Sequence, residues 1–160
     1  MDNGNAELIE RFYAAFADHD GDTMAACYAP QAHFWDPVFT DLEAGEPGAM
    51  WQMLTQRATD LKIELLDHQV QGDTGTAHWV AHYTFQTGRK VRNDVHATFT
   101  FADGLIVDHK DSFDLWEWTR QALGLPGKLL GWSPIIQGPV RRKARAQLDA
   151  YLAGKDAAVD

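Results

Sequence analysis

After Asp60 the hydrophobic period of the chain changes from that of a helix to that of a strand. From Lys62 to Phe113 apolar and polar residues alternate, and short turn-forming strings interrupt the alternation. This pattern predicts strands over 62–71, 76–87, 91–102 and 105–113. Asp103-Gly104 is a strong hairpin signal, so the last two strands are expected to pair antiparallel.

The residues before Asp60 show helical periodicity instead. Leu8, Phe12 and Phe16 recur at helical spacing and predict a helix over 6–18. Asp22 is expected to cap a second short helix, which ends before Pro30. A short strand over 32–36 and a third helix over 47–59 follow. Helices followed by a run of antiparallel strands are typical of an α+β fold.

The C-terminal part is predicted to be helical and interrupted. Helices are expected over 115–123 and 140–152, separated by the helix-breaking strings Pro126-Gly127 and Gly131-Trp132-Ser133-Pro134. The basic residues of the last helix are expected on its solvated face. We divide the chain into one domain, 1–160, with a core over about 6–118 and a helical extension over about 119–154.

Composition excludes several classes of partner. The 160 residues carry a formal net charge of −9, and an acidic surface repels nucleic acid. No apolar run reaches the roughly 20 residues that span a bilayer. The first residues, Met1 to Asn5, lack the pattern of a secretion signal, so we expect a cytoplasmic protein without membrane contact.

Three strings resemble the nuclear transport factor 2-like superfamily, in particular its SnoaL-like and ketosteroid isomerase-like branch. They are Ile9-Glu10-Arg11-Phe12-Tyr13-Ala14-Ala15-Phe16, Ala32-His33-Phe34-Trp35-Asp36-Pro37-Val38, and Gly104 to Phe113. The resemblance implies a cone-shaped α+β fold, in which three N-terminal helices pack on a strongly curved antiparallel sheet. A ligand pocket is expected at the wide end of the cone.

The resemblance also implies candidate catalytic residues. Asp36 matches the general-base aspartate of the ketosteroid isomerases, and Asp111 matches an inward acid/base aspartate of SnoaL-like cyclases. His109 lies two residues before Asp111. The isomerase oxyanion hole is not matched, because Phe12 and Ala97 stand where its two donors are expected.

Strand alternation sorts the remaining candidates by face. Val107, His109, Asp111 and Phe113 share one side of the last strand, and Val95, Ala97, Phe99 and Phe101 share one side of the strand before it. By resemblance, His78, Val80, His82 and Thr84 are expected to face the cone. The expected catalytic group is Asp36, His82, His109 and Asp111, with substrate-binding walls from Phe12, Phe16, Trp51, Leu54, Ile63, Leu65, Phe99, Phe101 and Phe113.

This group suits acid/base chemistry on a small apolar molecule that contains a carbonyl group. We expect an isomerase, cyclase or lyase without cofactor, with either Asp36 or Asp111 as the base. The alternative is a domain of the same fold that binds a small ligand or a protein without catalysis. Asp36 would then merely end a strand, and His109 with Asp111 would be a structural pair. An epoxide hydrolase triad is disfavoured, because Arg92 is expected on the wrong face.

Two further expectations concern assembly and metals. Trp79, Tyr83 and Phe85 are expected on the outer face of the sheet, where they would form a homodimer interface or be covered by the C-terminal residues of the same chain. We expect no metal site, because His78 and His82 would lie about 13 Å apart on one strand.

Overall fold

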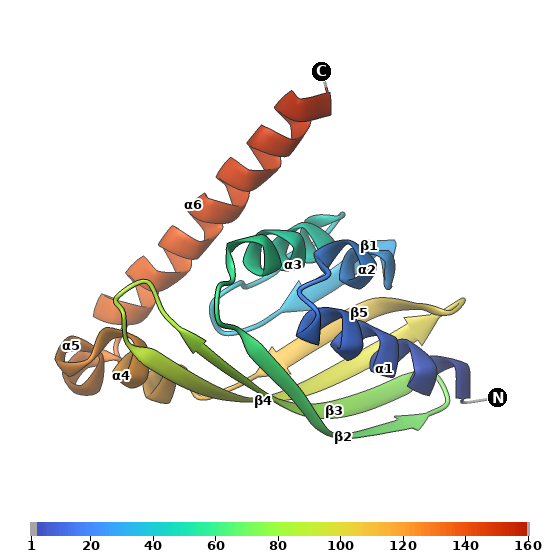
Figure 1. Cartoon of the computed structure of the whole chain (residues 1–160), viewed down its shortest axis with the longest axis horizontal. Coiled ribbons are helices and arrows are strands. Elements are labelled where there is room, and N and C mark those ends of the chain that lie inside the picture. The colour runs from blue at the N-terminus through green and yellow to red at the C-terminus, as the bar shows by residue number, and fades with distance from the viewer. Residues whose placement is uncertain (1–2, 160) are drawn as a thin grey trace.

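The structure is a computed structural model that describes residues 3–159. Its helices are α1 (Asn3–Ala17), α2 (Gly21–Ala26), α3 (Glu46–Arg57), α4 (Leu115–Leu123), α5 (Leu125–Leu130) and α6 (Pro134–Val159). Its strands are β1 (Tyr28–Trp35), β2 (Lys62–Gln71), β3 (Thr74–Thr84), β4 (Lys90–Ala102) and β5 (Leu105–Ser112). Helices α1 to α3 lie on one face of a curved sheet, as expected. Helices α4 and α5 lie at one end of the sheet, and α6 starts there and extends away past α3 (Figure 1).

The apolar stripe of α1 packs on the sheet and forms the centre of the core. Ile9 and Phe12 are fully buried there, and Phe16 is nearly so. Helix α2 begins two residues earlier than the sequence indicated, because its cap is Asp20 rather than Asp22. The following residue, Gly21, lies so close to α3 that a Cβ atom would come within 2.4 Å of the Thr55 hydroxyl oxygen.

The sheet has the strand order β1-β5-β4-β3-β2. Strands β2 to β5 pair antiparallel in sequence order, and the predicted β4–β5 hairpin across Asp103-Gly104 is confirmed. Both turn residues have positive φ, which a two-residue hairpin of this type requires. The expectation of a wholly antiparallel sheet is wrong, because β1 runs parallel to β5. A parallel pair needs a long crossover connection, and here α3 and β2–β4 provide it.

The predicted inner face of β4 is confirmed, whereas that of β3 is wrong. Val95 of β4 points toward the helices, and Trp79 of β3 lies directly opposite it in the register. Directly paired residues share a face, so Ala77, Trp79, Ala81 and Tyr83 face inward. His78, Val80 and His82 therefore face away from the helices, and Thr84 lies near the end of the strand.

An irregularity shifts the inner face of β5. Ile106 pairs with Phe101 and His109 pairs with Phe99, which leaves one extra residue between them on β5. His109 and Asp111 face inward as expected, and each is 1% exposed. Ile106, rather than Val107, is the inward residue that precedes them.

The C-terminal extension differs most from the sequence prediction. Helix α4 has the predicted bounds, but the residues after Pro126 form α5, because proline suits the first turn of a helix. Helix α6 begins at Pro134 and continues through Pro139. Its residues Ala144 and Leu148 join the core. Within residues 3–159, no helix combines the length and the apolar character that a bilayer crossing requires.

Candidate functional site

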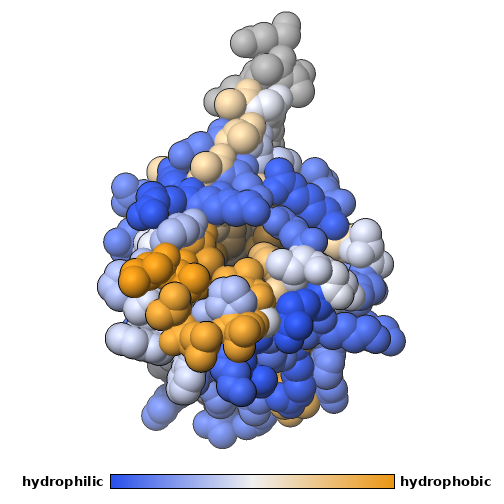
Figure 2. All heavy atoms as spheres, turned by 90° about the vertical axis from the view of Figure 1, so that its left-hand side faces the viewer, coloured by the Kyte–Doolittle hydropathy of each residue, from blue (hydrophilic) through white to orange (hydrophobic). Residues whose placement is uncertain are grey.

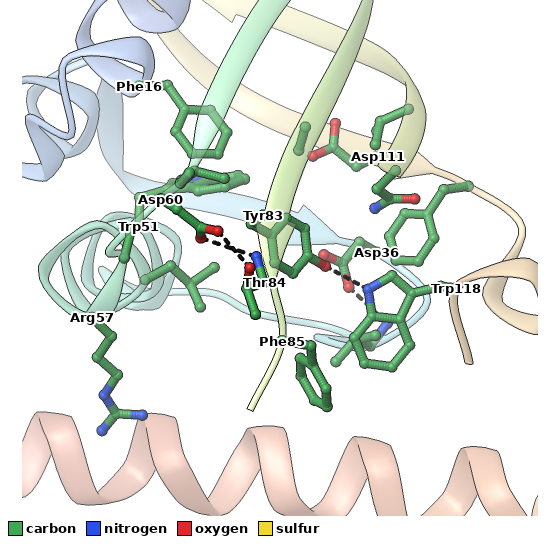
Figure 3. A pocket seen from close by; sticks show the side chains of 18 of the residues that line it. Phe16, Asp36, Trp51, Arg57, Asp60, Tyr83, Thr84, Phe85, Asp111 and Trp118 are labelled. Carbon is green, nitrogen blue, oxygen red and sulfur yellow. Dashed lines mark hydrogen bonds between the residues drawn. The ribbon is translucent and has the colours of Figure 1, made fainter. Parts of the chain in front are cut away.

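A cavity of about 290 Å³ opens between α3, the inner face of the sheet and α4. Its walls are mainly apolar, and they come from α1, α3, α4, α6, β3, β4, β5 and the segments between them (Figure 3). They include Phe16, Val38, Trp51, Leu54, Leu61, Trp79, Ala81, Tyr83, Phe85, Val95, Phe113 and Trp118, with Asp36, Asn93 and Asp111 as polar members. Such a volume lies at the small end of the range for ligand pockets.

Asp36 follows β1 directly and ends it in a turn. Its Oδ1 accepts hydrogen bonds from the backbone N–H groups of Val38 at 2.7 Å and Phe39 at 2.5 Å. Both bonds use the same oxygen, so the other, Oδ2, is left for a group in the cavity. Burial, reinforced by the nearby Asp111 carboxyl, raises the pKa of Asp36 to about 7 despite the two backbone hydrogen bonds.

Asp111 ends a buried chain of hydrogen bonds. Trp51 Nε1–H can only donate, and it donates to the Tyr28 hydroxyl oxygen at 2.8 Å. The Tyr28 hydroxyl lies 2.7 Å from Nδ1 of His109, and Nε2 of His109 lies 2.8 Å from Oδ1 of Asp111. With Tyr28 donating to Nδ1, the neutral imidazole carries its proton on Nε2 and donates it to Asp111.

His109 does not border the cavity, because Asp111 lies between them. Aromatic rings surround the imidazole, with Phe99 at 4.3 Å, Phe34 at 4.9 Å and Phe12 at 5.7 Å between ring centroids. His109 can therefore orient the Asp111 carboxyl but cannot touch a molecule in the cavity. This arrangement joins two of the predicted residues as one unit, in which Asp111 is the member that borders the cavity.

The predicted position of His82 is wrong. The β3 register places it opposite Arg92 on the outer face, where it is exposed. Arg92 is also on that face, as expected, and its Nη1 lies 3.7 Å from Asp94. Helix α3 contributes the cavity arginine, Arg57, whose side chain in Figure 3 extends toward α6 and away from Asp36.

The predicted walls separate into three groups. Phe16, Trp51, Leu54 and Phe113 border the cavity. Phe12, Phe99 and Phe101 are buried in the core and do not border it. Ile63 and Leu65 pack partly buried against the core, also away from the cavity. Inward-facing residues in the narrow part of the cone are therefore packed into the hydrophobic core. Only inward-facing residues toward the wide end of the cone reach the cavity.

Sequence analysis missed several polar groups of the cavity, among them the Asn93 amide and the Tyr83 hydroxyl. Asn93 lies on the inner face of β4, two residues before Val95. The Tyr83 hydroxyl accepts a hydrogen bond from Trp118 Nε1 at 2.6 Å, and Figure 3 shows both groups beside Asp36. Burial, with Asp36 adding to it, raises the pKa of Tyr83 to about 12 although this hydrogen bond opposes the rise. The correct face for β3 would have identified Tyr83, but no local signal in the sequence identifies Trp118.

The expected interface aromatics belong to this cavity as well. Trp79, Tyr83 and Phe85 border it and do not lie on the outer face, because the face assignment of β3 was reversed. These residues therefore give no support to a homodimer interface. The outer face carries polar residues instead, and His78, Asp94 and His96 there bring possible metal-binding atoms within 4.8 Å of one another.

The C-terminal helices close part of the cavity and add an apolar surface beside it. Trp118 and Gln147 border the cavity from α4 and α6. Arg141 Nε donates to the Pro37 backbone oxygen at 2.8 Å, which holds α6 beside the turn that contains Asp36. Exposed apolar residues lie on α5 and nearby, namely Leu125, Leu129, Leu130, Trp132 and Ile135, and Figure 2 shows apolar side chains gathered on this side next to a hollow.

Comparison with known proteins agrees with this architecture. Residues 9–109 match the family model of the SnoaL-like domain. A search of curated proteins finds no match. Among solved structures, an LEH-like epoxide hydrolase of M. tuberculosis has a TM-score of 0.65 and 18% identity, over 80% of this chain and 96% of that one.

Two other similar structures carry different names. A proposed SnoaL-like polyketide cyclase from Jannaschia sp. CCS1 has a TM-score of 0.67 and 18% identity, over 78% of this chain and 94% of that one. AclR, a proposed hydroxylase from Streptomyces galilaeus, has a TM-score of 0.64 and 16% identity, over 81% of this chain and 99% of that one. At these identities the likeness shows the fold alone, and the three names describe three chemistries.

Proposed function

Because the chain belongs to the SnoaL-like domain family, we propose that it is a cofactor-independent acid/base enzyme of isomerase, cyclase or lyase type. Its substrate would be a small, mostly apolar molecule that contains a carbonyl group. The family includes several chemistries, so the proposal rests on the cavity of this chain rather than on the fold.

The observation that carries the proposal is the Asp36 carboxyl. A general base works best when its pKa lies near the operating pH, and burial raises that of Asp36 to about 7. Its Oδ1 is held by two backbone N–H groups, which fix the carboxyl without occupying Oδ2. In this proposal Oδ2 takes a proton from a carbon next to the substrate carbonyl.

The cavity also offers donors for the enolate oxygen that this step creates. The Tyr83 hydroxyl already accepts from Trp118, so its own proton is available for a second partner. The side-chain amide of Asn93 offers two N–H groups on the neighbouring strand. We assign the role of polarising the carbonyl to these two residues, which replace the unmatched oxyanion hole of the isomerases.

Asp111 would act as the second carboxyl of the site. Nε2 of His109 donates a hydrogen bond to its carboxyl, and the charge of this carboxyl raises the pKa of Asp36. Asp36 is therefore the group that gains and loses the proton near neutral pH, and His109 is a positioning residue that acts through Asp111. This arrangement supports Asp36, rather than Asp111, as the base in this proposal.

Hydrogen–deuterium exchange tests the proposal without knowledge of the natural substrate. A panel of small cyclic ketones is incubated with the protein in D₂O, and exchange at the carbon next to the carbonyl is followed by proton NMR. We expect catalysed exchange by the wild type and a loss of about a hundredfold or more in Asp36→Asn. The control is Asp41→Asn, an aspartate whose side chain is 83% exposed.

The same experiment separates the enzyme from a binding domain. Ketones that bind in the cavity, detected by quenching of tryptophan fluorescence, without catalysed exchange would contradict the proposal and favour the non-catalytic alternative. Equal exchange by the wild type and Asp36→Asn would remove Asp36 from the mechanism.

A further inference from the structure

The outer face of the sheet carries a cluster of three potential metal-binding residues. His78 of β3 and His96 of β4 are directly paired across the two strands, and Asp94 lies two residues before His96 on the same face. Nε2 of His78 is 2.7 Å from Oδ1 of Asp94, and Nε2 of His96 is 3.7 Å from the same oxygen. The two imidazole rings are nearly parallel, with their centroids 4.2 Å apart.

This convergence is what distinguishes the cluster from an ordinary surface ion pair. One histidine would satisfy the carboxylate oxygen, yet both Nε2 atoms lie near it, side by side. The possible metal-binding atoms of the three residues all lie within 4.8 Å of one another. In a tetrahedral zinc site neighbouring donor atoms lie about 3.3 Å apart, so small rotations of these side chains would bring them into place.

The surroundings permit those rotations. The side chains of His78, Asp94 and His96 are 32%, 42% and 69% exposed, so an ion could reach them from solvent. The positive charge of Arg92 opposes the binding of a cation here, because its Nη1 lies 3.7 Å from Oδ2 of Asp94. That pair is exposed and contributes little, so it offers weak competition. The register also places Asp67 of β2 opposite His78, in the same row of the sheet.

We propose that His78, Asp94 and His96 form a binding site for a divalent transition-metal ion, with Zn²⁺ as the best match. Two imidazole nitrogens and one carboxylate oxygen suit zinc, whereas Mg²⁺ prefers oxygen ligands alone. The three residues leave a fourth position for water. The site lies on the face of the sheet opposite the cavity, so it is independent of the proposed acid/base function.

Calorimetric titration of the untagged, chelator-treated protein with zinc chloride tests this site. We expect one zinc ion per chain and an affinity at least about tenfold lower in His78→Ala and in His96→Ala. Asp94→Asn should also weaken binding, because it removes the negative charge. His82→Ala is the matched control, since His82 is an exposed histidine on the same face of β3. Titration with magnesium chloride should give no binding heat.

A second measurement separates loss of the site from loss of the fold. Zinc should raise the melting temperature of the wild type and of His82→Ala but not that of His96→Ala, whose side chain is mostly exposed. Absence of zinc binding by the wild type would overturn the proposal, as would an equal loss in His82→Ala. Undiminished binding by Asp94→Asn would overturn the three-residue site.

Discussion

The Tyr28 hydroxyl lies 2.7 Å from Nδ1 of His109 and thereby makes the imidazole a donor toward Asp111. The two residues come from β1 and β5, the parallel pair that sequence analysis did not anticipate. The orientation of the Asp111 carboxyl in the cavity thus depends on an edge strand joined to the sheet by a long crossover.

The first prediction is that Tyr28→Phe destabilises the protein. The change leaves Trp51 Nε1 and His109 Nδ1 buried without their partner, which costs about 1–3 kcal/mol for each unsatisfied group. Urea denaturation followed by circular dichroism measures the loss.

Tyr13→Phe is the control for this change. Tyr13 is also a buried tyrosine, but its hydroxyl has no hydrogen-bond partner among the residues that the structure describes. Removing that hydroxyl should leave the free energy of unfolding unchanged or raise it. Equal effects of the two changes would contradict the hydrogen-bond chain.

The second prediction concerns the pH dependence of stability. The pKa of Asp36 is raised from 3.8 to about 7 in the folded protein, so the folded state keeps a proton that the unfolded state releases. As the pH rises from about 4 to about 7, this difference lowers the free energy of unfolding by an amount on the order of 4 kcal/mol. Above that range both states are ionised and the difference becomes constant.

Urea denaturation at a series of pH values measures this effect in the difference between the wild type and Asp36→Asn. The asparagine keeps the oxygen that accepts from Val38 and Phe39 but has no proton to release. The wild type should lose stability relative to the variant as the pH rises. Asp41→Asn should follow the wild type, and parallel curves for wild type and Asp36→Asn would show that Asp36 titrates normally.

Much of the fold follows from local patterns. The Asp103-Gly104 hairpin and the bounds of β2 and α4 depend on neighbouring residues alone, and these predictions are confirmed. The inner face of β3 depends on its register with β4. Both faces of β3 contain residues that suit burial, since Trp79 alternates with Val80, so alternation alone could not select between them.

The cavity depends on contacts that are distant in the sequence, which is why it was predicted only in part. Asp36 and Asp111 were identified through resemblance to family strings. Trp118 belongs to α4, and no local pattern in the sequence indicates how this helix packs onto the sheet. The metal-binding candidates were missed for the same reason, because His78 and His96 become neighbours only through strand pairing.

The third prediction is that helix α4 is an integral part of the cavity wall. Trp118 is 8% exposed and packs with Leu115, Ala122 and Val91. Trp118→Ala should cost about 3–5 kcal/mol of stability and increase the fluorescence of a bound apolar dye, because the cavity opens. Trp116→Ala is the control on the same helix, where the side chain is 47% exposed. Similar losses from both changes would show that α4 packs loosely.

The fourth prediction links the two carboxyl groups of the cavity. Asp111 contributes to the raised pKa of Asp36, so Asp111→Asn should lower that pKa while burial continues to hold it above 3.8. The change is nearly isosteric, and the asparagine oxygen can still accept from Nε2 of His109. Carbon-13 NMR of the Asp36 carboxyl measures its titration midpoint directly. Asp108→Asn removes a charge from the exposed side of the same strand and should leave the midpoint unchanged. If the titration midpoint of Asp36 is the same in Asp111→Asn as in the wild type, burial alone raises the pKa of Asp36. The two carboxyl groups would then not act as a pair.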